Sequence, residues 1–254
     1  MQRTANAEVL VEVAVDSVAG ALAAAAAGAD RLELCQSLCC GGLTPSPGLC
    51  EAVRAAVTIP VFAMVRPRSG AFLYESTEFD VMLRDLRHLC SAGVDGVVAG
   101  ILLPTGHLDE ARLRALVTAA APRPFTCHRA FDLCVNPTAA IETLASLGVA
   151  RVLTSGQAAS APAGAAAIKA HVLQAGTRLV VMAGAGVRDD NVRTLVATTG
   201  VREVHLSAVT WHSSAMTFRR PGVPMGSSAP QDEYAQRGTD GAMVARVVAA
   251  VRAR

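Results

Sequence analysis

The sequence has almost no lysine. Lys169 is the only one among 254 residues, and arginine supplies all the other basic side chains. A Schiff-base aldolase or a pyridoxal phosphate enzyme needs a lysine at the reacting carbon. Lys169 lies in the middle of a predicted helix, away from the end of the fold where chemistry is expected. We therefore expect no Schiff-base lysine and no pyridoxal phosphate, and we expect no NAD.

Dense runs of one charge and long apolar runs are also missing. The net charge is +2 without a lysine or arginine block, so the electrostatic footprint of a nucleic-acid-binding protein is absent. Glu8, Glu12 and Asp16 interrupt the apolar N-terminal stretch, which argues against a signal peptide. No stretch reaches the roughly 18 charge-free apolar residues of a membrane helix. We expect a soluble protein without nucleic-acid or membrane partners.

The cysteines do not form the pattern of a disulfide framework. There are seven, an odd number, scattered through a chain long enough to bury a sizeable core. Such free thiols are typical of a reducing compartment, which predicts a cytoplasmic location.

Short apolar runs alternate with longer helical patterns along the whole chain. Eight such units predict a parallel sheet closed into a (β/α)8 TIM barrel, an α/β fold, as one domain over 1–254. An open doubly wound sheet is the alternative. The stretch 208–238 after the eighth strand is predicted to be a long loop or lid, followed by a C-terminal helix at 239–252. The predicted strands are 9–15, 31–35, 61–66, 96–100, 125–129, 151–155, 178–184 and 203–207.

Alternation along these strands predicts a polar barrel interior. Buried charges must be paired, so these residues could form a network that merely closes the barrel. Alternatively they form a site, because barrel enzymes place their chemistry at the C-terminal ends of the strands. The predicted inward residues are Glu12, Ala14, Glu33, Cys35, Phe62, Met64, Arg66, Thr126, His128, Val152, Thr154, Glu203, His205 and Ser207.

Arginines and glycine-rich loops at the predicted mouth favour an anionic ligand. Arg66 and Arg68 offer planar forks that suit carboxylate or phosphate. The backbone after the sixth, seventh and eighth strands offers N–H donors, as barrel phosphate sites do. These loop residues are Thr154, Ser155, Gly156, Gly184, Gly186 and Ser207.

Acid–base chemistry is one possibility for the same mouth. A metal-dependent hydrolase would use several His and Asp at strand ends, and His128, His205 and Asp132 are available, but no HxH pair is present. General acid–base work by His128 with Glu33 remains open.

Six motifs occur in an order that resembles the CutC copper-homeostasis family. They are "GADRLELCQSLCCGGLTPSPG", "VRPRSGAFLYES", "CHRAFD", "RVLTSG", "VMAGAGV" and "EVHLSA", within a match from about Val11 to Tyr234. The resemblance implies a (β/α)8 barrel, a cytoplasmic homo-oligomer (dimer or tetramer), and a role in copper tolerance with Cu(I) binding.

The resemblance also implies which residues are kept and which are changed. Where a family cysteine pair is proposed for copper, the second cysteine matches Cys35, but the first falls at Ala14. Cys40 stands where the family has a glutamate. Because Cu(I) prefers thiolates, a replacement site using Cys35 with Cys39 or Cys40 is a hypothesis. The family positions that are retained are Glu12, Glu33, Arg66, Arg68, His128, Arg129, Asp132, Ser155, His205 and Ser207.

Three functions remain open at this point. The first is Cu(I) binding in copper homeostasis. The second is a TIM-barrel enzyme that acts on a small anionic substrate carrying phosphate or carboxylate. The third is a non-catalytic metabolite sensor that uses the same pocket. For the enzyme, the candidate acid–base residues are Glu12, Glu33, His128, Asp132 and His205.

Overall fold

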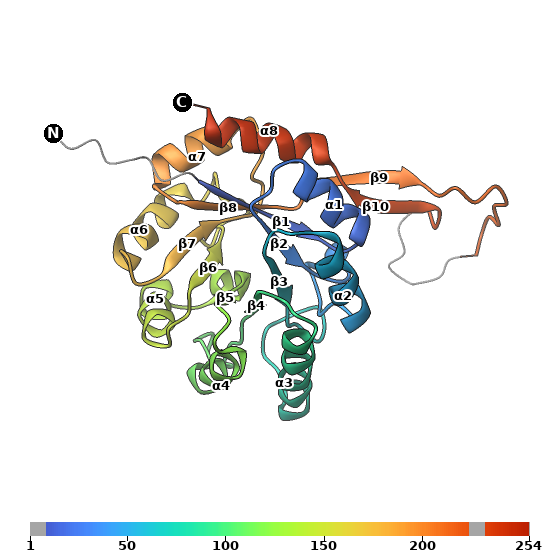
Figure 1. Cartoon of the computed structure of the whole chain (residues 1–254). Helices are drawn as coiled ribbons and strands as arrows, with labels where there is room; N and C mark the ends of the chain where they lie inside the picture. Colours follow the sequence, from blue (N-terminus) through green and yellow to red (C-terminus); the bar gives the residue numbers. More distant parts are fainter. Residues whose placement is uncertain (1–8, 224–231, 254) are drawn as a thin grey trace.

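Eight parallel strands close into a barrel in the computed structural model, which describes residues 9–223 and 232–253 (Figure 1). The strand order follows the chain, and β1 pairs with both β2 and β8 to close the sheet. The predicted TIM barrel is therefore confirmed. The strands are β1 (Leu10–Val15), β2 (Arg31–Leu34), β3 (Val61–Met64), β4 (Gly96–Ala99), β5 (Phe125–Cys127), β6 (Arg151–Thr154), β7 (Val180–Ala183) and β8 (Glu203–Leu206).

Helices surround the barrel, and side-chain caps fix the starts of five of them. Ser17, Ser46, Asp109, Asn136 and Asp240 each accept a hydrogen bond from a backbone N–H in the first turn of the helix that follows. The helices are α1 (Val18–Ala26), α2 (Pro47–Ala56), α3 (Ser76–Ser91), α4 (Glu110–Ala120), α5 (Pro137–Ser146), α6 (Ala165–Ala175), α7 (Val192–Thr199) and α8 (Gly241–Arg252), with short 3-10 turns η1 (Leu38–Cys40) and η2 (Arg129–Leu133).

The main hydrophobic core lies between the strands and the helices. Val11, Val13 and Val15 of β1 are fully buried there, as alternation predicts, and so are Leu32 and Leu34 of β2. The opposite faces of β1 and β2 therefore turn Glu12 and Glu33 into the barrel. This arrangement places charged side chains in the interior and apolar ones in the shell.

Strand β6 has the opposite alternation to the one predicted. Val152 packs in the shell and the Thr154 hydroxyl bonds to Asp132, so neither points inward as expected. Arg151 and Leu153 face the interior instead. The register explains the difference, because Arg151 is paired with the inward Thr126 of β5 and its guanidinium finds an acidic partner inside the barrel.

The stretch 208–238 is not simply an irregular loop. It holds an antiparallel pair, β9 (Val209–Ser213) and β10 (Ala235–Thr239), with 224–231 outside the described residues. This arm extends away from the barrel beside α1, so it does not form the expected lid (Figure 1). Its base borders the mouth through Val209 and Arg237. Within 9–223 and 232–253, no helix is long and apolar enough to cross a membrane.

Candidate functional site

A cavity of about 710 Å³ opens at the C-terminal ends of the strands, where TIM-barrel enzymes place their sites. Seven of the residues singled out in the sequence line it, and they come from β2, β3, β5, β7 and β8 or the loops that follow them. They are Glu33, Arg66, His128, Arg129, Gly186, His205 and Ser207.

A layer of paired charges lies inside the barrel beneath this cavity. Arg31 bonds to Glu12 through Nε and to Glu203 through one terminal nitrogen. The Nε of Arg151 lies 3.1 Å from Glu203 Oε2. Both guanidinium carbons lie 4.9 Å from the centre of the Phe62 ring, so this ring contacts both cations. We call Arg31, Glu12, Glu203 and Arg151 the charge layer.

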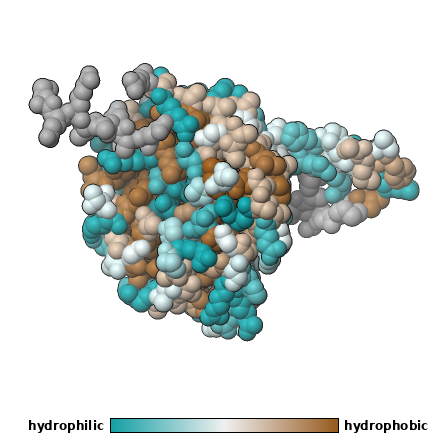
Figure 2. Space-filling model, in the orientation of Figure 1, coloured by the Kyte–Doolittle hydropathy of each residue, from teal (hydrophilic) through white to brown (hydrophobic). Residues whose placement is uncertain are grey.

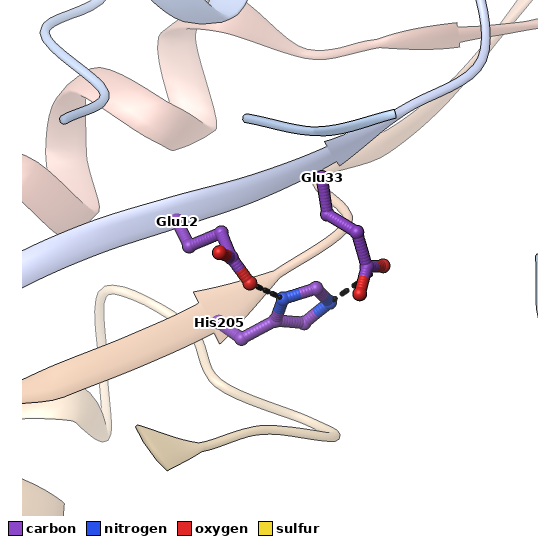
Figure 3. A group of neighbouring side chains, drawn as sticks. All are labelled: Glu12, Glu33 and His205. Carbon is purple, nitrogen blue, oxygen red and sulfur yellow. Dashed lines mark hydrogen bonds and ion pairs between the residues drawn. The ribbon is translucent and has the colours of Figure 1, made fainter. Parts of the chain in front are cut away.

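Glu12 also reaches upward and links this layer to the cavity through His205 (Figure 3). Its Oε1 lies 2.8 Å from His205 Nδ1, and His205 Nε2 lies 3.8 Å from Glu33 Oε2. Strand register causes this arrangement, since Glu12 is paired with His205 in β8 while Glu33 projects from the neighbouring β2. The Nδ1–H that donates to Glu12 fixes the ring so that Nε2 faces Glu33.

The three groups have different protonation tendencies. Burial opposes ionisation of Glu12, but the bonds to His205 and Arg31 outweigh it and hold its pKa at about 2. Burial raises the pKa of Glu33, and its Oε1 has no hydrogen-bond partner among the described residues. The pKa of His205 is raised, because the neighbouring carboxylates outweigh its burial. Glu12 is therefore a fixed anion, whereas Glu33 is a buried carboxyl whose charge is not neutralised by an arginine.

Cys35 directly follows β2 beside this group. It is fully buried, and its Sγ lies 3.5 Å from Glu33 Oε2. Burial and the Glu33 charge raise the pKa of the thiol well above its usual range. Gly42 closes over it with φ +86°, and a Cβ at that position would lie 2.9 Å from the sulfur, so the close approach requires glycine. Met64 packs in the same small cluster and lines the cavity.

The other two cysteines of the opening motif are placed differently. Cys39 and Cys40 lie on η1, are exposed, and have sulfurs 3.9 Å apart. Within the described residues, no hydrogen bond joins either thiol to that of Cys35. The structure therefore presents one buried thiol behind the cavity lining, beside Glu33, and two exposed thiols on η1, next to the lining residues Leu38 and Gly41.

Two buried donors on the cavity wall, Arg66 after β3 and His128 after β5, lack a partner among the described residues. Arg66 donates to backbone carbonyls from both terminal nitrogens, but its Nε has no acceptor. His128 Nδ1 accepts from the N–H of Ala130 at 3.1 Å, so Nε2 carries the proton of the neutral ring, and this atom also has no partner. Burial and the Arg66 charge lower the pKa of His128 to about 3. Phe72 stacks against both side chains.

Asp132 organises the loops behind the cavity instead of lining it. Its carboxylate accepts hydrogen bonds from the Thr154 hydroxyl, from the backbone N–H groups of Ser155 and Gln157, and from Arg129 Nε. The N–H of Gly156 in turn donates to the Thr154 hydroxyl at 2.8 Å. Because Asp132 belongs to η2, these hydrogen bonds hold the loop after β6 against η2.

Two further predicted residues also lie away from the cavity lining. Gly184 packs under Leu153, where a Cβ would lie 2.5 Å from that side chain. Arg68 is outside, paired with Glu78 at 2.5 Å and 42% exposed in its side chain. Three lining arginines, Arg188, Arg237 and Arg246, were missed. Only Arg188 had a signal, since it follows the "AGAG" loop after β7.

Comparisons with known proteins agree with one another. The model of the CutC family matches residues 9–210. A human protein named copper homeostasis protein cutC homolog is 46% identical over 231 residues, covering 91% of this chain and 85% of its own. A CutC family protein from Klebsiella pneumoniae is 46% identical, covering 96% and 99%. The crystal structure of CutC from Streptococcus agalactiae has a TM-score of 0.75 and 30% identity, covering 78% and 97%.

Proposed function

The chain belongs to the CutC family, and we propose that it acts in copper homeostasis by binding Cu(I) at the mouth of its barrel. One observation carries the proposal. The buried Cys35 thiol packs beside Met64 and is separated from His205 Nε2 by a single carboxylate. Thiolate, thioether and imidazole are ligands that copper accepts, and the first two favour Cu(I).

Met64 offers a second sulfur in place of the family cysteine that is absent at Ala14. Ala14 leaves the first strand without a thiol, but Met64 from β3 brings a second sulfur to the cluster that holds Cys35. Cu(I) would bind the thiolate, so binding would release the proton that burial and Glu33 hold on the sulfur. The exposed thiols of Cys39 and Cys40 at the rim are not needed in this arrangement.

Competition with a coloured Cu(I) chelator under anaerobic conditions tests this proposal. We expect Cys35→Ala to abolish tight binding and Met64→Leu to weaken it. The matched control is the double variant Cys39→Ala/Cys40→Ala, which should keep wild-type affinity. Equal stoichiometry in the wild type and Cys35→Ala would refute the site, and loss of binding in the control would move it to the rim.

A second candidate function rests on a separate observation. Arg66 Nε and His128 Nε2–H are buried donors without acceptors on the cavity wall, and Gly186 and Ser207 line the same space. Buried donors of this kind suit a small anion, so we propose that the cavity binds a phosphate- or carboxylate-bearing molecule. In an enzyme, His128→Ala would lose turnover and keep ligand affinity, whereas a sensor has no turnover to lose.

The anion proposal is tested by thermal unfolding with inorganic phosphate. Ligand bound only to the native state raises the melting temperature. Arg66→Met should remove this shift, while Arg68→Met should keep it because Arg68 lies outside the cavity. An equal shift in both variants would contradict the proposal.

The proposal extends to the location and assembly of the protein. Exposed neighbouring thiols at Cys39 and Cys40 persist most easily in a reducing compartment, which supports the cytoplasm.

The arm exposes Trp211, Met216 and Phe218, and Figure 2 shows apolar residues along it, which supports a homo-oligomer, a dimer or tetramer. Sedimentation equilibrium of the wild type and Trp211→Ser tests the assembly, since a monomeric wild type would contradict it.

A further inference from the structure

We infer that the mouth of the barrel also takes a divalent cation of the Zn²⁺ class, held by Glu33, His205 and Cys35, with Glu12 as the residue that positions the imidazole. This site shares Cys35 with the proposed Cu(I) site, but it does not depend on Cu(I) binding. Glu33 lies on β2 and Cys35 directly follows it, whereas His205 lies on β8. These two strands flank β1 in the barrel.

Glu33 is the centre of this group. Its Oε2 lies 3.5 Å from Cys35 Sγ and 3.8 Å from His205 Nε2, so thiol, carboxyl and imidazole converge from three directions. Ligand atoms of Glu12, Glu33 and His205 all lie within 4.8 Å of one another. Binding one ion requires these side chains to move until each donor lies about 2.0–2.3 Å from the metal.

Glu12 belongs behind the histidine and not on the ion. The two ring nitrogens of an imidazole point in divergent directions, so one ion cannot use both. Glu12 Oε1 already accepts the Nδ1–H at 2.8 Å, and its other oxygen bonds to Arg31. The free Nε2 faces Glu33 (Figure 3). A carboxylate behind a metal-binding histidine is the usual way to fix its tautomer and orientation.

An independent observation points to a cation at this position. Glu33 is 4% exposed, and its Oε1 is buried without any hydrogen-bond partner. Within the described residues, Glu33 forms no ion pair with an arginine, because Arg31 is engaged by Glu12 and Glu203. A buried carboxyl oxygen normally has a donor or a metal. Because Oε2 is the oxygen nearest to Cys35 and His205, a cation among these groups would satisfy Oε1 by binding both oxygens of the carboxylate.

The chemistry of the donors selects the class of ion. Zn²⁺ accepts carboxylate oxygen, imidazole nitrogen and thiolate sulfur, whereas Cu(I) gains little from a carboxylate. Three protein ligands leave a fourth position, and the group faces the cavity that Arg66 and His128 also line. Such an open position is the mark of a metal site that binds water or a small ligand.

Zinc titration of chelator-treated full-length protein, read by calorimetry and by metal analysis after dialysis, tests this inference. We expect one Zn²⁺ per chain in the wild type. Glu33→Gln should lose at least tenfold in Zn²⁺ affinity and keep its Cu(I) affinity. Met64→Leu should keep its Zn²⁺ affinity and lose Cu(I) affinity. Co²⁺ substituted for Zn²⁺ should give a thiolate-to-metal absorption band that Cys35→Ser removes.

The positioning role of Glu12 has its own readout. Glu12→Gln keeps an acceptor for Nδ1–H but removes the charge, so Zn²⁺ affinity should fall by about 10- to 100-fold. The thiolate band of the Co²⁺ protein should persist, because Cys35 remains a ligand. Loss of that band in Glu12→Gln would show a general disruption of the site and would overturn the positioning role.

Several results would overturn the cation site. They are a wild type that retains no Zn²⁺, an unchanged affinity in Glu33→Gln, or loss of Zn²⁺ in Cys39→Ala/Cys40→Ala. If Glu33→Gln fails to fold, a missing thiolate band in the wild-type Co²⁺ protein overturns it instead. If the wild type binds Cu(I) but not Zn²⁺, only this inference is refuted. If it binds Zn²⁺ but not Cu(I), only the copper proposal is refuted.

Discussion

The barrel interior contains two polar regions that differ in one respect. In the charge layer, every carboxylate of Glu12 and Glu203 has an arginine partner. At the mouth, Glu33, Arg66 and His128 each keep a buried atom without a partner. Buried charge alone therefore does not mark a binding site in this protein. Tyr74 and His171 also keep such an atom, but outside the cavity lining, so the mouth is distinguished by three unpaired buried atoms around one cavity that a bound ligand would satisfy.

The largest effect should come from breaking the charge layer. Arg31→Ala leaves Glu12 and Glu203 buried without their shared cation, which should lower the free energy of unfolding by roughly 3–5 kcal/mol. Urea unfolding monitored by circular dichroism measures the change. A loss below about 1 kcal/mol would show that the layer does not hold the barrel together.

A smaller loss is expected behind the mouth, at Asp132. Asp132→Ala removes the acceptor for the Thr154 hydroxyl and the Ser155 N–H, both on fully buried residues, and each buried unpaired donor costs about 1–3 kcal/mol. We expect a total loss of roughly 3 kcal/mol, read from the same unfolding curves. The control is Asp190→Ala on the exposed rim, which should change stability by less than about 0.5 kcal/mol. Equal losses of stability in Asp132→Ala and Asp190→Ala would show that Asp132 does not stabilise the loop after β6.

At the mouth, the pH dependence of stability should report His128. Its pKa is about 3 in the folded chain and 6.5 in the reference state, so between these values the unfolded chain binds a proton that the native one excludes. The stability that the neutral His128 contributes to the native state is complete above pH 6.5 and is lost as the pH falls. From pH 7 to 5, the wild type should lose about 2 kcal/mol more than His128→Gln. Identical slopes would mean that folding does not lower the pKa of His128.

The smallest effect is expected outside both regions. Arg68 pairs with Glu78 and stacks on Tyr74 in a partly exposed position. Arg68→Ala should therefore lower the free energy of unfolding by no more than about 1 kcal/mol. A loss comparable with that of Arg31→Ala would remove the distinction between buried and exposed pairs.

Much of this arrangement could be predicted from the sequence. Strand alternation placed Glu33 and Cys35 inside the barrel, and the same parity extended two residues back would have found Arg31. Alternation gave the wrong face in β6, because four residues with a threonine and an arginine at the ends carry no clear apolar face. Pairing with Thr126 and Glu203, both distant in sequence, decides that strand.

Other features depend on contacts that no local pattern encodes. The arm contains exposed and polar strands, which lack the apolar signal of β1 or β2, so 208–238 looked irregular. The cysteine motif predicted closeness along the chain, but η1 turns Cys39 and Cys40 outward while Cys35 stays buried. Met64, which lies in the same cluster as Cys35, is 29 residues away and is brought near by the pairing of β2 with β3.

Parallel unfolding of Glu203→Gln and Glu33→Gln tests the difference between the two regions most directly. Glu203→Gln removes the anion that two arginines share and should lower the free energy of unfolding by roughly 3 kcal/mol. Glu33→Gln replaces a carboxyl that has no arginine partner and should change it by less than about 1 kcal/mol. Equal losses, or a larger loss for Glu33→Gln, would contradict the account.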